Sequence, residues 1–182
     1  MLRDNIRGTR MACVVVDPQR KFYLKHPEWE SIRDSAVTGI NRYMGMFRER
    51  GLPVIFIHFD GPTHEPYPGD DGDEWLQGID FRDTDIVVHK GYMSCFKNTD
   101  LEKVLRDLGA DCILLTGMLT DFCVISTYYS ASERGIAPYM GKGALIAYNE
   151  KGNEAAEIIC STVEEDVLQR FLDGKQAPIT DF

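Results

Sequence analysis

The sequence predicts an α/β fold in which helices cover both faces of a mainly parallel sheet. Short apolar runs typical of buried strands alternate along the chain with amphipathic segments of helical period. The apolar runs are nearly continuous, which favours parallel strands buried on both faces. With 182 residues, 43% of them apolar, the chain can form one sizeable core, and we expect residues 1–182 to form a single domain.

The predicted strands are short and end at turn signals. In chain order we expect strands at 11–16, 53–59, 86–89, 112–116 and 136–140. A turn is predicted at 141–143, after which 144–148 either continues the sheet or wraps over it. A short last strand is predicted at 178–182.

The predicted helices lie between these strands. Helical spacing covers 28–50, 100–108, 121–134 and 154–172, the last with a break at Ser161-Thr162. The stretch 60–85 is rich in Gly, Pro and Asp and has no sustained period, and so long a loop is usually functional or mobile. Together these elements predict a Rossmann-like three-layer α/β/α architecture with right-handed crossovers.

Charge and composition limit the possible partners. The net charge of −9 argues against nucleic acid or an anionic membrane surface as the main partner. No apolar run reaches the length of a membrane span, and residues 1–10 lack the apolar core of a signal peptide. The five cysteines are odd in number and widely spaced, which predicts free thiols in a reducing cytoplasm and argues against a zinc site built from cysteines.

Three reactive side chains follow strands at one edge of the predicted sheet. Asp17 ends the first strand, Lys90 ends the third, and Cys123 follows the fourth. Ligands of such sheets bind outside the carboxyl ends of the strands, so the three side chains are expected to meet there. A carboxylate, an ammonium and a thiol together favour attack on an amide-like carbonyl and hydrolysis of the resulting thioester.

Cys123 is expected in the first turn of a helix, for which Thr120 is a candidate N-cap. The free N–H groups and the macrodipole at that position favour the thiolate, and the charge of Lys90 lowers the thiol pKa further. Taken singly, each residue also fits a structural role. Cys123 fits a small buried hydrophobe, Asp17 a turn residue, and Lys90 a solvated strand end. Their joint arrival at one edge favours the catalytic interpretation.

Three ordered motifs resemble the isochorismatase-like cysteine hydrolases, the family that includes nicotinamidases, N-carbamoylsarcosine amidohydrolases and isochorismatase. The matching residues are Asp17, Gln19 and Phe22; Lys90, Ser94, Phe96, Thr99 and Leu101; and Gly117, Thr120, Cys123, Val124 and Thr127. The resemblance covers residues 11–140 and carries correct spacing within each motif.

The resemblance implies roles for residues at this edge. It implies that Asp17, Lys90 and Cys123 form the catalytic triad of the family. It also implies a cis peptide bond between Met118 and Leu119, and an oxyanion hole formed by the backbone N–H groups of Leu119 and Cys123. Family members usually form homo-oligomers, so a dimer or tetramer is expected.

One departure from the nicotinamidases concerns metal binding. Those enzymes bind a metal through Asp-x-His and a further His, whereas the matching stretch here contains His58 and Asp60 in reversed order, with His64 beyond. A pocket wall or solvated loop is the favoured interpretation, so we predict no metal and no organic cofactor. The three ligand-type side chains nevertheless leave metal binding open.

The sequence therefore predicts a cysteine-dependent hydrolase that cleaves a C–N bond of a small amide or ureide. Phe22, Trp75 and Tyr92 are predicted to line the substrate pocket, although Trp75 fits a loop anchor equally well. One alternative is cleavage of a vinyl ether, as isochorismatase performs, but those enzymes lack the nucleophilic cysteine. The other is a non-catalytic binding member of the family, in which Cys123 is inert.

Overall fold

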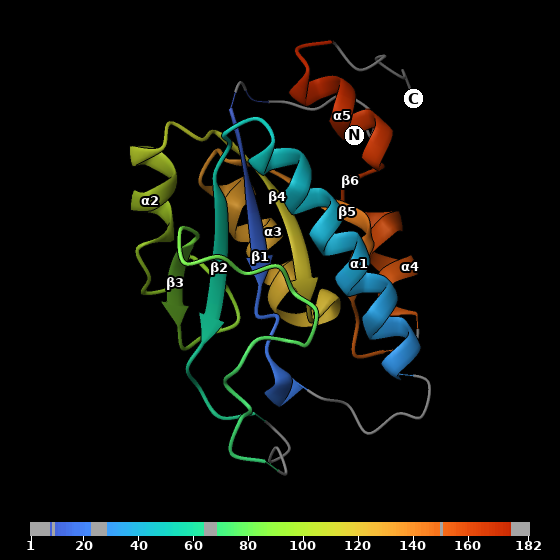
Figure 1. The fold of residues 1–182 in the computed structure, drawn as a ribbon. Coiled ribbons are helices and arrows are strands. Elements are labelled where there is room, and N and C mark those ends of the chain that lie inside the picture. Colours follow the sequence, from blue (N-terminus) through green and yellow to red (C-terminus); the bar gives the residue numbers. More distant parts are fainter. Residues whose placement is uncertain (1–7, 9, 23–28, 64–68, 150, 176–182) are drawn as a thin grey trace.

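The computed structural model describes residues 8, 10–22, 29–63, 69–149 and 151–175 and shows one parallel sheet between helices (Figure 1). Within these residues the sheet has six strands in the order β3-β2-β1-β4-β5-β6, and every pair is parallel. The strands are β1 (Met11–Val16), β2 (Val54–Phe59), β3 (Ile86–Lys90), β4 (Cys112–Met118), β5 (Ala137–Ile146) and β6 (Thr162–Val163). The predicted three-layer α/β/α fold is confirmed.

Helices cover both faces of the sheet, and Figure 1 shows α1 in front of it and α3 behind. The helices are α1 (Trp29–Arg48), α2 (Leu101–Asp107), α3 (Ile125–Glu133), α4 (Gly152–Ile159) and α5 (Glu165–Leu172), with short turns η1 (Arg20–Phe22) and η2 (Thr120–Val124). None of these helices combines the length and the apolarity that crossing a membrane requires.

Strand β1 divides the core into two layers because successive side chains of a strand point to opposite faces. Ala12, Val14 and Val16 pack in the layer formed with α2 and α3. Met11, Cys13 and Val15 pack in the layer formed with α1 and α5. All six residues of β1 are buried, which explains why its sequence is continuously apolar rather than alternating.

The predicted turn at 141–143 is wrong, because these residues lie inside β5. Leu115 of β4 pairs with Met140, and two residues later Gly117 pairs with Leu145, so β5 carries extra residues as a bulge. Met140 and Leu145, on either side of Gly141 and Gly143, remain paired with β4. Gly143 lies within the bulge and has a φ of +75°, a conformation that glycine adopts without strain.

The C-terminal segment follows the sequence in part. The predicted break at Ser161-Thr162 is confirmed, since α4 ends at Ile159, β6 occupies Thr162–Val163, and α5 begins at Glu165. The predicted last strand at 178–182 lies outside the described residues.

Gly117 of β4 lies beside Val16 of β1 with no space for a Cβ, and it predicts a stability difference between two glycine variants. A Cβ at Gly117 would stand 2.2 Å from the carbonyl oxygen of Val16, and its φ is +100°. At Gly51, with a φ of +64°, a Cβ would meet no atom within 4 Å. We expect Gly51→Ala to cost about 1 kcal/mol of unfolding free energy and Gly117→Ala about 3 kcal/mol or more, measured by urea denaturation. Equal losses in the two variants would contradict the close approach.

Candidate active site

Lys90 and Asp17 form a fully buried ion pair at the carboxyl ends of the strands. Lys90 Nζ lies 2.8 Å from Asp17 Oδ2, and both side chains are inaccessible to solvent. The same ammonium donates to the backbone oxygens of Tyr92 (3.1 Å) and Met93 (3.0 Å). An ammonium has three N–H donors, so these three acceptors satisfy it completely. The Phe59 ring, with its centroid 5.2 Å from Nζ, completes the enclosure.

Asp17 keeps unused acceptor capacity in a buried position. Apart from contacts with Lys90 and with the thiol of Cys123, its carboxylate oxygens have no hydrogen-bond partner among the described residues. Burial raises the pKa of Asp17 to about 6, although the charge of Lys90 opposes that rise. The carboxylate is therefore ionised at neutral pH and binds a proton far more readily than an exposed aspartate does.

The turn that carries Cys123 differs from the predicted one. Cys123 lies in the π-helical turn η2, between the end of β4 and the start of α3, and its side chain is buried. The candidate N-cap Thr120 does not cap the turn, because Leu119 occupies the cap position and no side chain caps it. The hydroxyl of Thr120 instead donates to Asn153 Oδ1 at 2.6 Å, a partner from α4 that local sequence does not reveal.

The protonation state of Cys123 also corrects an expectation. Burial, followed by the negative charge of Asp17, raises the pKa of the Cys123 thiol to about 12, while Lys90 lowers it. The predicted effect of Lys90 has the right direction, but desolvation outweighs it. The resting site therefore holds an ionised Asp17 beside a protonated thiol.

The backbone before Cys123 forms a tight turn around Leu119. The peptide bond between Met118 and Leu119 is cis, as the family resemblance implied. The N–H groups of Phe122 and Val124 both donate to the carbonyl oxygen of Leu119, each at 3.1 Å. Whether the N–H groups of Leu119 and Cys123 hold an oxyanion remains a prediction.

The three predicted pocket residues have different surroundings. The Phe22 ring packs at a tilt against the Phe59 ring, with centroids 5.7 Å apart, and the ammonium groups of Lys90 and Lys21 also lie over Phe59. Tyr92 is 46% exposed, and its ring lies under Lys97. Their role in binding substrate stays a prediction.

Trp75 matches the loop-anchor alternative more closely. Its ring packs against Phe56 and Phe81 with centroids 5.3 and 5.4 Å away, and its backbone pairs with Gln19. Arg48 of α1 reinforces the anchor through an ion pair with Asp85. The described end of the long loop is thereby fastened to the α1 side of the molecule.

Two residues of the matched motifs have connecting roles that the sequence did not reveal. Thr127 Oγ1 accepts a hydrogen bond from the Cys95 N–H (3.0 Å) and donates to the Cys123 carbonyl (2.7 Å). It therefore ties the segment after Lys90 to the turn that carries Cys123. Gln19 Oε1 accepts from the N–H of Phe59 at 2.8 Å and joins the end of β1 to the end of β2.

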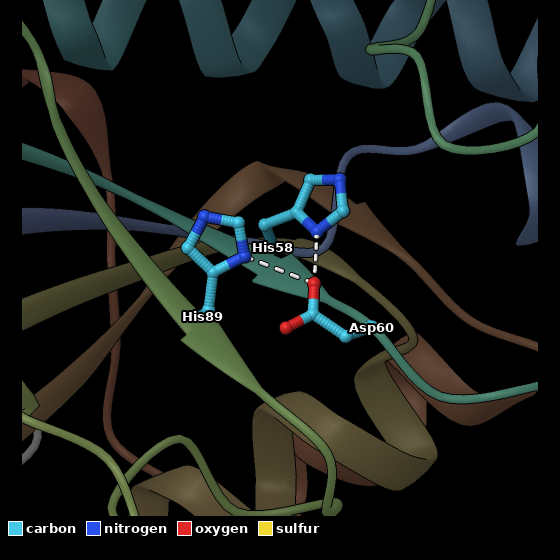
Figure 2. A group of neighbouring side chains, drawn as sticks. All are labelled: His58, Asp60 and His89. Carbon is cyan, nitrogen blue, oxygen red and sulfur yellow. Dashed lines mark hydrogen bonds and ion pairs between the residues drawn. The ribbon is translucent and has the colours of Figure 1, made fainter.

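A second polar cluster lies at the ends of β2 and β3 (Figure 2). It consists of His58, Asp60 and His89. One ring nitrogen of each histidine and one carboxylate oxygen of Asp60 all lie within 4.8 Å of one another. His64, which the sequence offered as the third candidate ligand, lies outside the described residues. His89 was missed because its place opposite His58 follows from the strand register, not from local sequence.

Comparison with known proteins identifies relatives over most of the chain. The isochorismatase domain family matches residues 11–158. The chain is 27% identical over 167 residues to the isochorismatase family protein YrdC of Bacillus subtilis, covering 90% of this chain and 88% of that protein. It is 24% identical over 185 residues to Nicotinamidase 3 of Arabidopsis thaliana, covering 90% and 89%. The solved structure of N-carbamoylsarcosine amidase from Thermoplasma acidophilum matches with a TM-score of 0.71 and 26% identity, covering 86% of this chain and 95% of that one.

Proposed function

We propose, starting from the fact that this chain belongs to the isochorismatase family of hydrolases, that it cleaves a C–N bond of a small amide or ureide through a cysteine thioester. The observation that carries the proposal is the buried Lys90–Asp17 pair in contact with the thiol of Cys123. The similarity of this chain to an N-carbamoylsarcosine amidase and to a nicotinamidase also supports hydrolysis of a C–N bond.

The first half of the reaction forms the thioester. As Cys123 Sγ attacks the carbonyl carbon, the Asp17 carboxylate accepts the thiol proton, so attack does not require a thiolate in the resting site. The N–H groups of Leu119 and Cys123 stabilise the negative charge that develops on the substrate oxygen. Asp17 then gives its proton to the leaving nitrogen, the C–N bond breaks, and ammonia or an amine departs.

The second half regenerates the thiol. Water attacks the thioester carbonyl while Asp17 accepts one of its protons, and the C–S bond breaks. The proton returns to Cys123 as the acid is released. Lys90 keeps its charge throughout, and that charge opposes further rise in the pKa of both Asp17 and Cys123.

The proposal is tested by measuring ammonia release from a panel of small amides and ureides. The panel contains nicotinamide, N-carbamoylsarcosine and short aliphatic amides, and each compound is also incubated with Cys123→Ala protein as the blank. Release above the blank from at least one compound is expected. Folded wild-type protein that releases ammonia from none of them would favour the non-catalytic binding alternative.

The pKa of Asp17 predicts an acid limb in the pH profile of the reaction. Asp17 must be ionised to accept the thiol proton, and burial raises its pKa to about 6. We expect kcat/KM to fall about tenfold per pH unit below that value and to level off above it. Circular dichroism at each pH separates this loss from unfolding. A limb near the ordinary pKa of an exposed aspartate would contradict the assignment of Asp17 as the base.

Further proposals concern organisation and location. We propose that residues 1–182 act as a single domain in the cytoplasm and that the protein is a homo-oligomer, a dimer or tetramer. Ile158 and Ile159 at the end of α4 are 66% and 51% exposed, which supports an interface there. Light scattering of the purified protein measures the oligomeric state.

A further inference from the structure

The π-helical turn η2, which carries Cys123, depends on contacts with a neighbouring segment. No side chain caps its first turn, and π-helical turns are rare outside functional sites. The two predicted oxyanion donors are the N–H groups of Leu119, directly before the turn, and of Cys123, within it. Any movement of the turn therefore moves both donors, so the contacts that hold it bear directly on catalysis.

The inner side of the turn is held by Asn153 of α4. Thr120 Oγ1 donates to Asn153 Oδ1 at 2.6 Å, and Asn153 Nδ2 donates to the carbonyl oxygen of Leu145 at 3.1 Å. A backbone carbonyl can only accept, so Leu145 selects the orientation of the amide and directs its oxygen at the Thr120 hydroxyl. Leu145 is in turn the register partner of Gly117 in β4, the strand that leads into the turn.

The outer side of the turn is held by the next residue, Asp121. Its carboxylate accepts the N–H groups of Tyr148 at 2.8 Å and of Asn149 at 2.9 Å, both from the segment after β5. These bonds are exposed, and water can replace them. The Thr120 side chain is fully buried, so its bond to Asn153 has no such substitute.

We propose that Asn153, acting through Thr120, is a positioning residue for the hydrolysis. Its hydrogen bond holds the turn so that the N–H groups of Leu119 and Cys123 face the oxygen that becomes negatively charged. This inference rests on the proposed thioester mechanism and adds to it a residue of α4 that lies outside the three matched motifs. A displacement of about 1 Å in such a site can lower the rate about 100-fold.

The test compares four variants with the best substrate of the amide panel. Thr120→Val removes the hydroxyl and keeps its shape, and Asn153→Leu removes the acceptor at similar volume. Each should lower kcat about 10- to 100-fold and change KM less than about threefold, because the lost stabilisation belongs to the transition state. The double variant should be no slower than the slower single variant, since both break one bond. Thr120→Ser keeps the hydroxyl and should retain kcat within about threefold of wild type.

Thr116→Val is the matched control. Thr116 is also fully buried, in the strand that leads to the same turn, and apart from the thiol of Cys13 its hydroxyl has no hydrogen-bond partner among the described residues. This variant should keep the kcat and KM of wild type. Circular dichroism and urea denaturation verify that every variant is folded.

Aldehyde binding examines the same turn without any turnover. The probe is the aldehyde counterpart of the best substrate, or propionaldehyde if the panel yields none. The Cys123 thiol adds across its C=O bond: a C–S bond forms, the thiol proton passes to the oxygen, and a tetrahedral hemithioacetal results. Its oxygen takes the place of the oxyanion. Binding is measured as protection of Cys123 from iodoacetamide, and Thr120→Val and Asn153→Leu should each weaken it about tenfold or more.

The outcomes separate this inference from the proposed function. Wild-type kcat in Asn153→Leu would overturn the inference and leave the hydrolase proposal standing. A rise in KM alone would also overturn it, because it would assign the pair to substrate binding. Weakened protection in both variants of a protein that hydrolyses nothing would remove the proposed function and keep the positioning of the turn. Equal protection in wild type and both variants, or protection in none, would overturn the inference whatever the turnover.

Discussion

Replacing Cys123 with alanine is expected to lower kcat/KM at least about 10⁴-fold, because no other group can form the covalent intermediate that the proposed reaction needs. The side chain is small and packs in the α2 and α3 layer, so its truncation should cost only about 1 to 2 kcal/mol of stability. Activity is measured as ammonia release from the best substrate of the panel. Circular dichroism and urea denaturation verify the fold.

Cys112→Ala is the matched control for this experiment. Cys112 is also buried and lies at the start of β4, the strand that leads to Cys123, but at the opposite end of the sheet. The control should lose stability to a similar degree and keep wild-type kcat/KM. Residual activity of Cys123→Ala within tenfold of wild type would remove Cys123 from the mechanism and would reopen the vinyl ether alternative, which needs no nucleophilic thiol.

Replacing Lys90 with methionine is expected to destabilise the protein by about 3 to 5 kcal/mol at pH 7.5, because it leaves the Asp17 carboxylate buried without a counter-charge. The Asp17 and Lys90 side chains are both fully inaccessible to solvent, so water cannot compensate. The loss should shrink at acid pH. Asp17 has a pKa of about 6 beside Lys90, and removing Lys90 raises that pKa further. At pH 5 the Asp17 carboxyl of the Lys90→Met variant is therefore protonated and neutral. Urea denaturation at pH 7.5 and pH 5 measures both values.

The double variant Asp17→Asn with Lys90→Met separates charge from packing. It removes both charges and keeps the approximate volumes, so it should recover most of the stability lost in Lys90→Met. Asparagine also tolerates the positive φ of +46° found at residue 17. A double variant no more stable than Lys90→Met would show that the single variant fails through packing. Neither variant should retain turnover.

The sequence predicts the sheet and its reactive edge because both depend on local pattern. The β-branched run of β1 and the apolar run of β4 are buried on both faces, and such runs are typical of a parallel sheet covered by helices. Once the strands are parallel, their carboxyl ends coincide. This places Asp17, Lys90 and Cys123 together without knowledge of any contact.

The parts that the sequence did not predict depend on register and burial. His89 joins His58 only because the two are register partners across β2 and β3. The raised pKa of Cys123 follows from desolvation, which cannot be read from the residues that flank it. The bulge in β5 appears only when its pairing with β4 is known.

The strand order has a consequence for how activity arises during folding. Asp17 and Lys90 come from β1 and β3, which have β2 between them, while Cys123 follows β4 on the other side of β1. These contacts join distant segments of the chain, and such contacts form late and slowly. A partly folded chain therefore holds the three groups apart. Recovery of hydrolysis after dilution from denaturant should lag behind the recovery of helical signal, and it would report the moment at which the central strands have all found their neighbours.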